Sequence, residues 1–216
     1  MLIERPQWHS CACCPPNLAR LIASLGGYLW SEDEDTVYAH LLIGSEVKTG
    51  HAEISVSSAY PWNGQAKYTI ERCDKPFELA VHIPAHAKNP AVCINGKPAE
   101  FRMKNGYAYL DAAEGDCVEI RFDMPPRRIR THPSVKYTAG KTALARGPLV
   151  YCFEGADNPG GLAGVKLSED ADIRILEYDK DLLSGIAQMQ AAELRAIPYY
   201  AWSNRGKNEM RVFLNE

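Results

Sequence analysis

The 216-residue sequence lacks an excess of basic residues, because 24 Lys and Arg stand against 27 Asp and Glu for a net charge of −3. Nucleic-acid-binding domains show a basic surface, so this balance argues against a nucleic-acid partner. The sequence also lacks an apolar run near the roughly 18 residues of a membrane-spanning helix, so we expect no membrane span. Glu4, Arg5 and His9 interrupt the first ten residues, which argues against a signal peptide there.

A disulfide framework, internal repeats and low-complexity segments are lacking as well. The seven cysteines are odd in number, and their spacings suggest no pairing. We therefore expect a reducing compartment and a cytoplasmic location. The length allows one large domain or two small ones, and a 46% hydrophobic composition is enough for a substantial core.

The densest chemistry lies near the amino terminus, in the run Cys11-Ala12-Cys13-Cys14-Pro15-Pro16-Asn17. Thiols placed this close together suit a soft metal such as zinc. The two prolines stiffen the backbone and fix the entry into a following helix. A thiol held near a metal and a helix start ionises easily and is a good nucleophile. The alternative is a cluster of small buried thiols without a function.

Helical spacing of apolar residues predicts a helix over 16–30, ended or frayed by Gly26-Gly27. This helix is so apolar that most of its surface needs covering, yet no second helix follows nearby. The acidic cluster 31–35 is expected to be a solvated turn. From Thr36 onward the pattern has a period of two residues and predicts strands at 36–43, 52–57, 66–71, 77–83, 107–110 and 117–122.

Turn signals separate these strands. Asn95-Gly96 is typical of a type I′ hairpin, and Asn105-Gly106 is a second signal of this kind. Residues 127–132 are either a last strand or a linker, and residues 142–153 hold an apolar run interrupted by Gly147-Pro148. Weaker strands are expected near 172–178, 186–191 and 209–214. We therefore predict a mainly β fold of two β-sandwich, jelly-roll-like units at 31–132 and 133–216, preceded by the segment 1–30.

The run CCPPN followed by a helix resembles glycoside hydrolase family 127, the β-L-arabinofuranosidase family. The resemblance covers essentially the whole chain, through the motifs Leu79–Pro84, Ala87–Asn89, Val92–Lys97, Met124-Pro125, His132-Pro133, Gly140-Lys141, Ala145–Cys152, Asp157-Asn158, Ile197–Trp202 and Asn204–Gly206. Together these motifs are specific, whereas any one of them alone is weak.

The resemblance implies an (α/α)6 barrel that carries the active site, followed by two β-sandwiches, so 1–30 is expected to be the barrel's C-terminal remnant. It implies retaining hydrolysis of arabinofuranosides or related glycosides with a zinc-bound cysteine nucleophile. By resemblance Cys13 is the nucleophile and a zinc ligand, and Cys14 is a second ligand. Cys11 lies in the same neighbourhood but receives no ligand role.

The sequence departs from the family pattern before the nucleophile. The family's acid/base glutamate and its remaining zinc ligands, a glutamate and a cysteine, precede the nucleophile by a long stretch. Glu4 is the one carboxylate ahead of Cys13 and matches neither role. We therefore expect a C-terminal fragment that is inactive alone and carries an incomplete zinc site. The alternative is a non-catalytic sandwich module for barrel support, homodimerisation or carbohydrate binding.

Several further residues with reactive or aromatic side chains are expected to have structural roles. Cys73, Cys93, Cys117 and Cys152 fall on predicted strands and are expected to be packing residues. His82 and His86 have the i, i+4 spacing of a helical metal pair, but they lie on a strand and a turn, so satisfied or surface histidines are expected. Trp62 and Trp202 either stack on sugar rings or, as we expect, fill the fold. Arg127, Arg128 and Arg130 are expected to lie on a solvated face or to form an ion pair with the missing barrel, rather than to bind nucleic acid.

Overall fold

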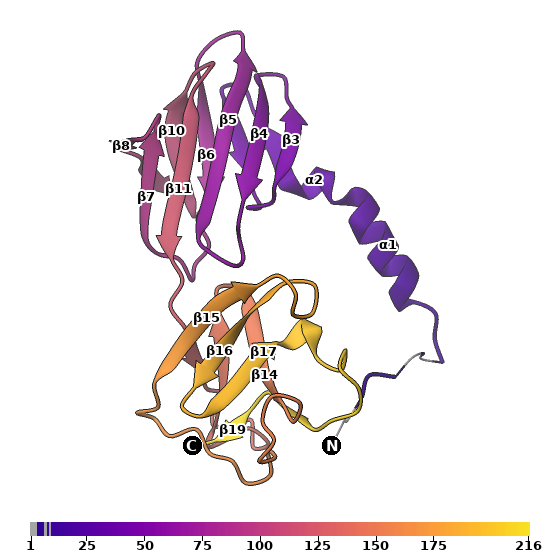
Figure 1. Cartoon of the computed structure of the whole chain (residues 1–216). Helices are drawn as coiled ribbons and strands as arrows, with labels where there is room; N and C mark the ends of the chain where they lie inside the picture. Colours follow the sequence, from indigo (N-terminus) through magenta and orange to yellow (C-terminus); the bar gives the residue numbers. More distant parts are fainter. Residues whose placement is uncertain (1–3, 7, 9) are drawn as a thin grey trace. The chain divides into compact units, whose positions relative to one another are not determined.

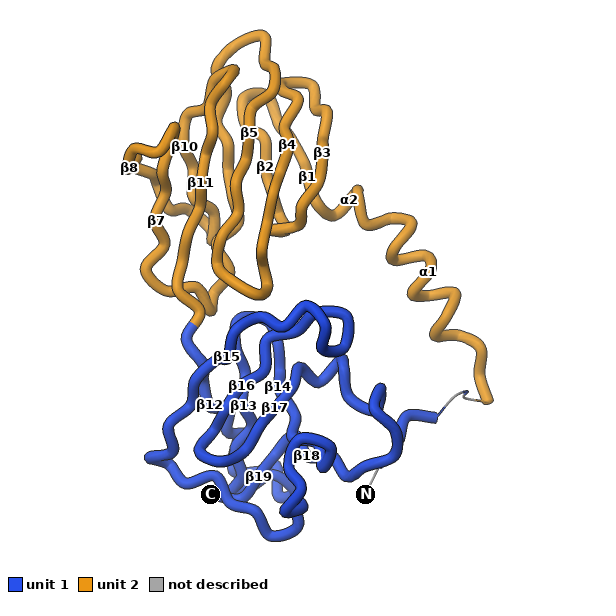
Figure 2. The backbone as a smooth tube through the Cα atoms, in the orientation of Figure 1, with its two compact units in different colours: residues 1–8, 125–216 blue, residues 9–124 orange. Residues whose placement is uncertain are grey.

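The computed structural model describes residues 4–6, 8 and 10–216, and its chain forms two compact units (Figure 1; Figure 2). One unit comprises residues 9–124, and the other joins residues 1–8 to residues 125–216. Residues 1–3, 7 and 9 of the predicted barrel remnant lie outside the described part, and His9 is one of them. Strands dominate both units, which confirms the mainly β fold predicted from the sequence.

The predicted helix is present but divided. Helix α1 runs over Cys14–Ser24 and a short α2 over Gly26–Leu29. Helix α1 begins two residues before the predicted start because the first turn of a helix tolerates proline, whose missing N–H has no intrahelical partner there. Gly26-Gly27 were expected to end or fray the helix. Helix α1 ends at Ser24, just before them, and the two glycines open α2. No residue of α1 is buried, so its apolar side is uncovered as the sequence suggested.

The unit of residues 9–124 is a sandwich of two sheets that enclose one apolar core. The first sheet has the order β1 (Trp30–Glu32), β2 (Thr36–Ala39), β6 (Phe77–His82), β10 (Tyr107–Ala112) and β9 (Arg102–Lys104). The second has the order β3 (Ser45–Lys48), β4 (Ala52–Ser58), β5 (Gln65–Cys73), β11 (Cys117–Asp123), β7 (Lys88–Ile94) and β8 (Lys97–Ala99). Within these sheets β2 and β6 pair in parallel and the other described pairs are antiparallel.

Alternation of inward and outward residues explains why these segments are strands. In β6 the inward Phe77, Leu79 and Val81 are buried, and β11 follows the same rule. Both Asn-Gly turns are confirmed, since Asn95, Gly96, Asn105 and Gly106 all have positive φ, as a type I′ turn requires. The predicted solvated turn at 31–35 is wrong for its first two residues, because Ser31 and Glu32 pair with β2.

The unit that contains residues 125–216 has eight strands around a second core. Six follow the order β12 (Arg127–Ile129), β13 (Lys141–Arg146), β14 (Leu149–Glu154), β17 (Leu194–Pro198), β16 (Ile186–Ala191) and β15 (Ile173–Asp179). In addition β18 (Met210–Arg211) pairs with β14, and β19 (Leu214–Asn215) pairs with β13. A 3-10 turn, η1 (Tyr199–Ala201), follows β17 directly and opens the loop that leads to β18.

Along the sequence, the boundary between the two units falls between Met124 and Pro125, earlier than the boundary after residue 132 predicted from the sequence. The difference lies in β12, because residues 127–129 pair with β13 and so belong with the later strands. Among the residues that the structure describes, no helix is long and apolar enough to cross a membrane.

Candidate functional site

Cys13 and Cys14 lie at the start of α1, and their two Sγ atoms are 3.8 Å apart. Cys13 is the N-cap residue, but its side chain makes no capping hydrogen bond. Both thiols are exposed, as is Cys11. A pair of accessible thiols at a helix start therefore exists as the sequence predicted, and the expectation of small buried thiols does not describe it.

The turn that carries the pair is fixed by Asn17. The backbone N–H and the side-chain Nδ2 of Asn17 both donate to the carbonyl oxygen of Cys13, at 3.2 and 2.9 Å. The Nη2 atom of Arg20 donates to Oδ1 of Asn17 at 2.7 Å and so holds the amide in this orientation. Proline in the first turn adds a fixed φ. Asn17 therefore anchors the backbone of Cys13, a role that sequence reasoning did not assign.

The geometry of the pair suits two ligands of one zinc ion. Tetrahedral zinc with Zn–S bonds of about 2.3 Å keeps two sulfur ligands about 3.8 Å apart, which follows from the tetrahedral angle. The observed separation of 3.8 Å agrees with this requirement. Within residues 4–6, 8 and 10–216, however, no group of three His, Cys, Asp or Glu side chains is placed to hold a metal ion. The pair therefore fits half of a four-ligand site.

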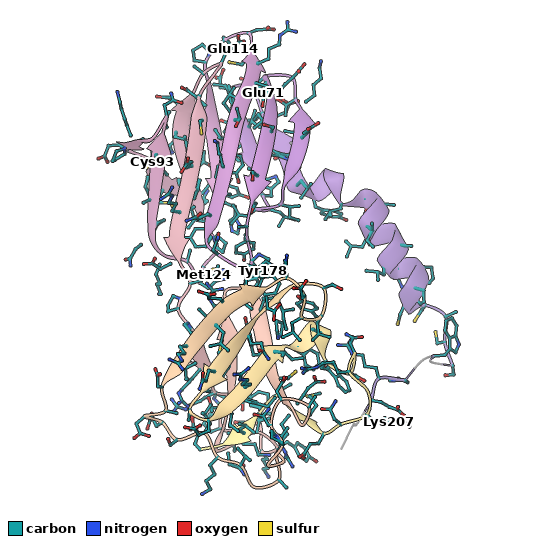
Figure 3. The ribbon with its side chains drawn as sticks, viewed as in Figure 1. Glu71, Cys93, Glu114, Met124, Tyr178 and Lys207 are labelled. Atoms are coloured by element: carbon teal, nitrogen blue, oxygen red, sulfur yellow. The ribbon has the colours of Figure 1, made fainter. Side chains whose placement is uncertain are left out.

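The other cysteines lie on strands, as predicted. Cys73, Cys93 and Cys117 are half-buried on β5, β7 and β11, and Figure 3 labels Cys93 on β7. Cys152 is fully buried on β14, where desolvation, followed by the nearby Glu154 carboxylate, raises the pKa of its thiol to about 12. A thiol with so high a pKa is a poor nucleophile at neutral pH.

His82 and His86 each contact a tyrosine. The rings of His82, on β6, and Tyr107 are tilted with centroids 5.4 Å apart, and His86 Nε2 is 3.2 Å from the hydroxyl of Tyr60. Both histidines are half-buried and engaged with tyrosines, in agreement with the expectation of satisfied side chains.

The basic run makes contacts inside the unit of residues 125–216. Arg127 donates to the carbonyl of Gly147, and Arg128 donates to the carbonyl of Ser168. Arg130 forms ion pairs with Glu169 and Glu216 at 3.0 and 2.8 Å. All three arginines therefore have hydrogen-bond or ion-pair partners within this unit.

A second polar cluster lies where β17 leads into the loop of residues 199–207. Trp202 is 4% exposed and fills the fold, as expected. The Arg5 guanidinium carbon lies 5.3 Å from the centroid of the Trp202 ring, and Arg5 also donates to the carbonyl oxygens of Tyr199 and Tyr200. Sequence reasoning missed this contact, because nearly two hundred residues separate Arg5 from its partners.

Comparison with known proteins identifies both β units. Residues 36–124 match the profile described as the β-L-arabinofuranosidase GH127 middle domain, and residues 126–215 match the glycoside hydrolase family 127 C-terminal domain. A non-reducing end β-L-arabinofuranosidase of Bifidobacterium longum subsp. longum is 33% identical over an alignment 252 positions long, which covers 99% of this chain and 38% of the relative.

Solved structures agree with these matches. A GH127 β-L-arabinofuranosidase from Geobacillus stearothermophilus T6 superposes with a TM-score of 0.89 and 38% identity, over 100% of this chain and 39% of that chain. A second structure, of a GH127 β-arabinofuranosidase, gives a TM-score of 0.86 and 31% identity over 98% of this chain and 40% of that one. The chain thus spans about two fifths of the length of the relatives it matches.

Proposed function

The chain belongs to glycoside hydrolase family 127, and from this premise we propose that it forms the nucleophile-bearing part of a retaining β-L-arabinofuranosidase. The observation that carries the proposal is the exposed pair Cys13–Cys14, held at the start of α1 in a chain whose relatives are β-L-arabinofuranosidases. The substrate is an arabinofuranoside or a related glycoside.

In the proposed reaction the thiolate Sγ of Cys13 attacks the anomeric carbon. The C–S bond forms while the glycosidic C–O bond breaks, and its electron pair goes to the leaving oxygen, which a carboxylic acid protonates. The resulting carboxylate then takes a proton from water, whose oxygen attacks the same carbon and displaces the sulfur as a thiolate. Two inversions at one carbon give overall retention.

The proposed division of labour among this chain's residues follows from their positions. Cys13 provides the attacking atom, and Cys14 is proposed as a second ligand of the metal. Asn17 holds the carbonyl of Cys13 and so restricts the direction in which that residue presents its thiol. Zinc bound at the pair supplies positive charge that favours the anionic form of a coordinated sulfur.

We assign the acid/base carboxylate to no residue of this chain. Glu4 precedes the thiol pair, but its carboxylate is 3.0 Å from the Nζ atom of Lys207 and is engaged in that ion pair. The 216-residue chain alone is therefore proposed to be inactive, because acid/base catalysis typically contributes about 10²–10⁴-fold. A cytoplasmic location is proposed because all seven cysteines are free and the chemistry needs a reduced thiol.

The test compares the 216-residue chain with the longest natural protein that contains it, on an aryl β-L-arabinofuranoside. We expect turnover in the longer protein, loss of it in Cys13→Ser, and little change in the matched control Cys11→Ser. Turnover that survives Cys13→Ser would overturn the nucleophile assignment. Absence of turnover in both proteins, together with binding of arabinofuranosyl oligosaccharides, would favour a non-catalytic sandwich module. Homodimerisation through the sandwiches stays a prediction.

A further inference from the structure

The loop of residues 199–207 is held by a buried ionic network. The Glu154 carboxylate at the end of β14 is fully buried, and its Oε2 atom accepts from Nη2 of Arg205 at 2.6 Å. Arg205 Nη1 also donates to Asp157 at 2.8 Å. These partners, the Asp157 carboxylate foremost, raise the pKa of Arg205. Breaking a buried pair of this kind leaves an uncompensated charge, so the network resists displacement of Arg205 from its partners.

The same network shapes the part of the loop that contacts Arg5. The second oxygen of Glu154 accepts from the backbone N–H of Ser203 at 2.7 Å. Ser203 has a φ of +66°, a left-handed conformation that non-glycine residues rarely adopt without support. With Ser203 fixed in this way, its hydroxyl, the Trp202 ring and the carbonyls of Tyr199 and Tyr200 form a preformed receptor.

Arg5 occupies this receptor through its side chain and its backbone. Its Nη2 atom donates to the carbonyl oxygens of Tyr199 and Tyr200 at 3.1 and 2.9 Å, and its guanidinium lies over the ring of Trp202. Its backbone N–H donates to the hydroxyl of Ser203 at 2.9 Å.

The neighbouring residue adds a further contact. Glu4 is paired with Lys207, which Figure 3 labels in the loop beside this segment. Residues 4 and 5 therefore contact the loop through both side chains and one backbone N–H.

The receptor suits a guanidinium specifically. A planar, delocalised cation can stack on an indole while its N–H groups donate in the ring plane, which an ammonium cannot do. The indole is fixed because Trp202 is almost fully buried. The contact is therefore more selective than a surface ion pair of the Glu4–Lys207 kind, which alone contributes little.

We propose that Arg5 is a positioning residue of the thiol site, and that the loop of residues 199–207 is the surface on which the chain is anchored as it approaches that site. Arg5 lies eight residues before Cys13 in the sequence. Arg5 lies on the chain that leads to Cys13, so fixing Arg5 limits the positions that Cys13 can reach, and small displacements of a reacting group are costly to rate. The positioning role rests on the proposed function, whereas the anchoring does not.

The anchoring is tested by amide hydrogen exchange on the 216-residue chain. We expect Arg5→Ala to speed exchange at position 5 and across 199–205 by at least tenfold, while the exposed control Arg72→Ala leaves both unchanged. Arg5→Lys should recover part of the protection, since an ammonium can donate to the two carbonyls without stacking on Trp202. Equal exchange in wild type and Arg5→Ala would overturn the anchoring.

The positioning role is tested by kinetics in the longest natural protein that contains this chain. We expect Arg5→Ala to lower kcat at least tenfold with KM changed less than twofold, and Arg5→Lys to restore part of kcat. An unchanged kcat in Arg5→Ala, in a protein whose turnover depends on Cys13, would overturn the positioning role alone. Turnover that does not depend on Cys13 would overturn the proposed function and this role with it, and the exchange result would still decide the anchoring.

Discussion

Gly64, directly before β5, shows how a single missing side chain lets the backbone approach β11 closely. A Cβ atom built at this buried glycine would lie 2.0 Å from the backbone oxygen of Phe122, far inside van der Waals contact. The backbone of Gly64 is held there because its carbonyl accepts from the N–H of Phe122 at 2.9 Å.

We expect Gly64→Ala to destabilise the sandwich by about 1–3 kcal/mol or more, since the obstacle is backbone and cannot rotate away. Denaturant unfolding of the variant checks this, with Gly26→Ala as the control because nothing lies within 4 Å of its Cβ position. A loss of stability as large in Gly26→Ala would show that the close approach at Gly64 is not the cause.

His40 predicts a pH dependence for the same sandwich. Burial, followed by the nearby charge of His82, lowers the pKa of His40 from its ordinary 6.5. As the pH falls, His40 is therefore protonated near pH 6.5 in the unfolded chain but only at a lower pH in the folded chain. Since the unfolded state then holds more protons, the free energy of unfolding falls as the pH falls below 6.5 towards the folded pKa.

Urea unfolding between about pH 7.5 and 5.5 measures this effect. His40→Gln should flatten the dependence, and the exposed control His132→Gln should leave it unchanged. If the free energy of unfolding of His40→Gln depends on pH as steeply as that of the wild type, His40 is not the cause of the dependence.

At the residue scale, the sequence predicts which side chains are reactive better than it predicts which residues they contact. The run Cys11-Ala12-Cys13-Cys14 was predicted as a site because thiols so closely spaced suit a metal or a nucleophile, and the family resemblance then singled out Cys13 and Cys14. Arg5 was not predicted as a functional residue, because its receptor consists of backbone carbonyls and a distant tryptophan. Backbone acceptors have no signature in the sequence, so contacts of this kind need a structure.

Among the elements, α1 buries none of its residues. Leu18, Leu21 and Ile22 are 58%, 52% and 64% exposed, although their spacing is that of a packed helical face. The stability of the 216-residue chain should therefore depend little on them, because each keeps more than half of its accessible surface in contact with water.

We expect the double variant Leu21→Ser, Ile22→Ser to change the free energy of unfolding by no more than about 0.5 kcal/mol. Leu79→Ala, at a fully buried position of β6, should cost about 2–5 kcal/mol. Urea denaturation of the two variants compares them directly. A large loss from the helix variant would mean that α1 is covered in solution.

Element prediction succeeded where local signals and core packing agree. The strands β4, β5, β6, β11 and β16 alternate clearly or carry a compact apolar run, and the Asn-Gly turns fix two hairpins. The short strands β3 and β9 were missed because each has four or fewer residues, and β9 is wholly exposed. Such strands are held by their neighbours' backbones, and their own sequences carry little pattern.

On the scale of the whole molecule, the two thiols predict weak zinc binding by this chain alone. A structural zinc site has four ligands and is worth about 10–16 kcal/mol, whereas Cys13 and Cys14 supply two. Titration against a competing chelator should show zinc that is easily removed and is lost in Cys14→Ser, with Cys73→Ser as the control. A stoichiometric monomeric site of about nanomolar affinity would contradict this expectation.

The central claim, that Cys13 is the nucleophile of a retaining arabinofuranosidase, is tested most directly by locating the covalent intermediate. The longest natural protein that contains this chain is treated with a slow arabinofuranoside substrate, quenched, digested and examined by mass spectrometry. The account predicts one arabinofuranosyl group on Cys13, absent in Cys13→Ser and present in Cys11→Ser. A glycosyl group found on a carboxylate, or on Cys14 with Cys13 unmodified, would contradict it.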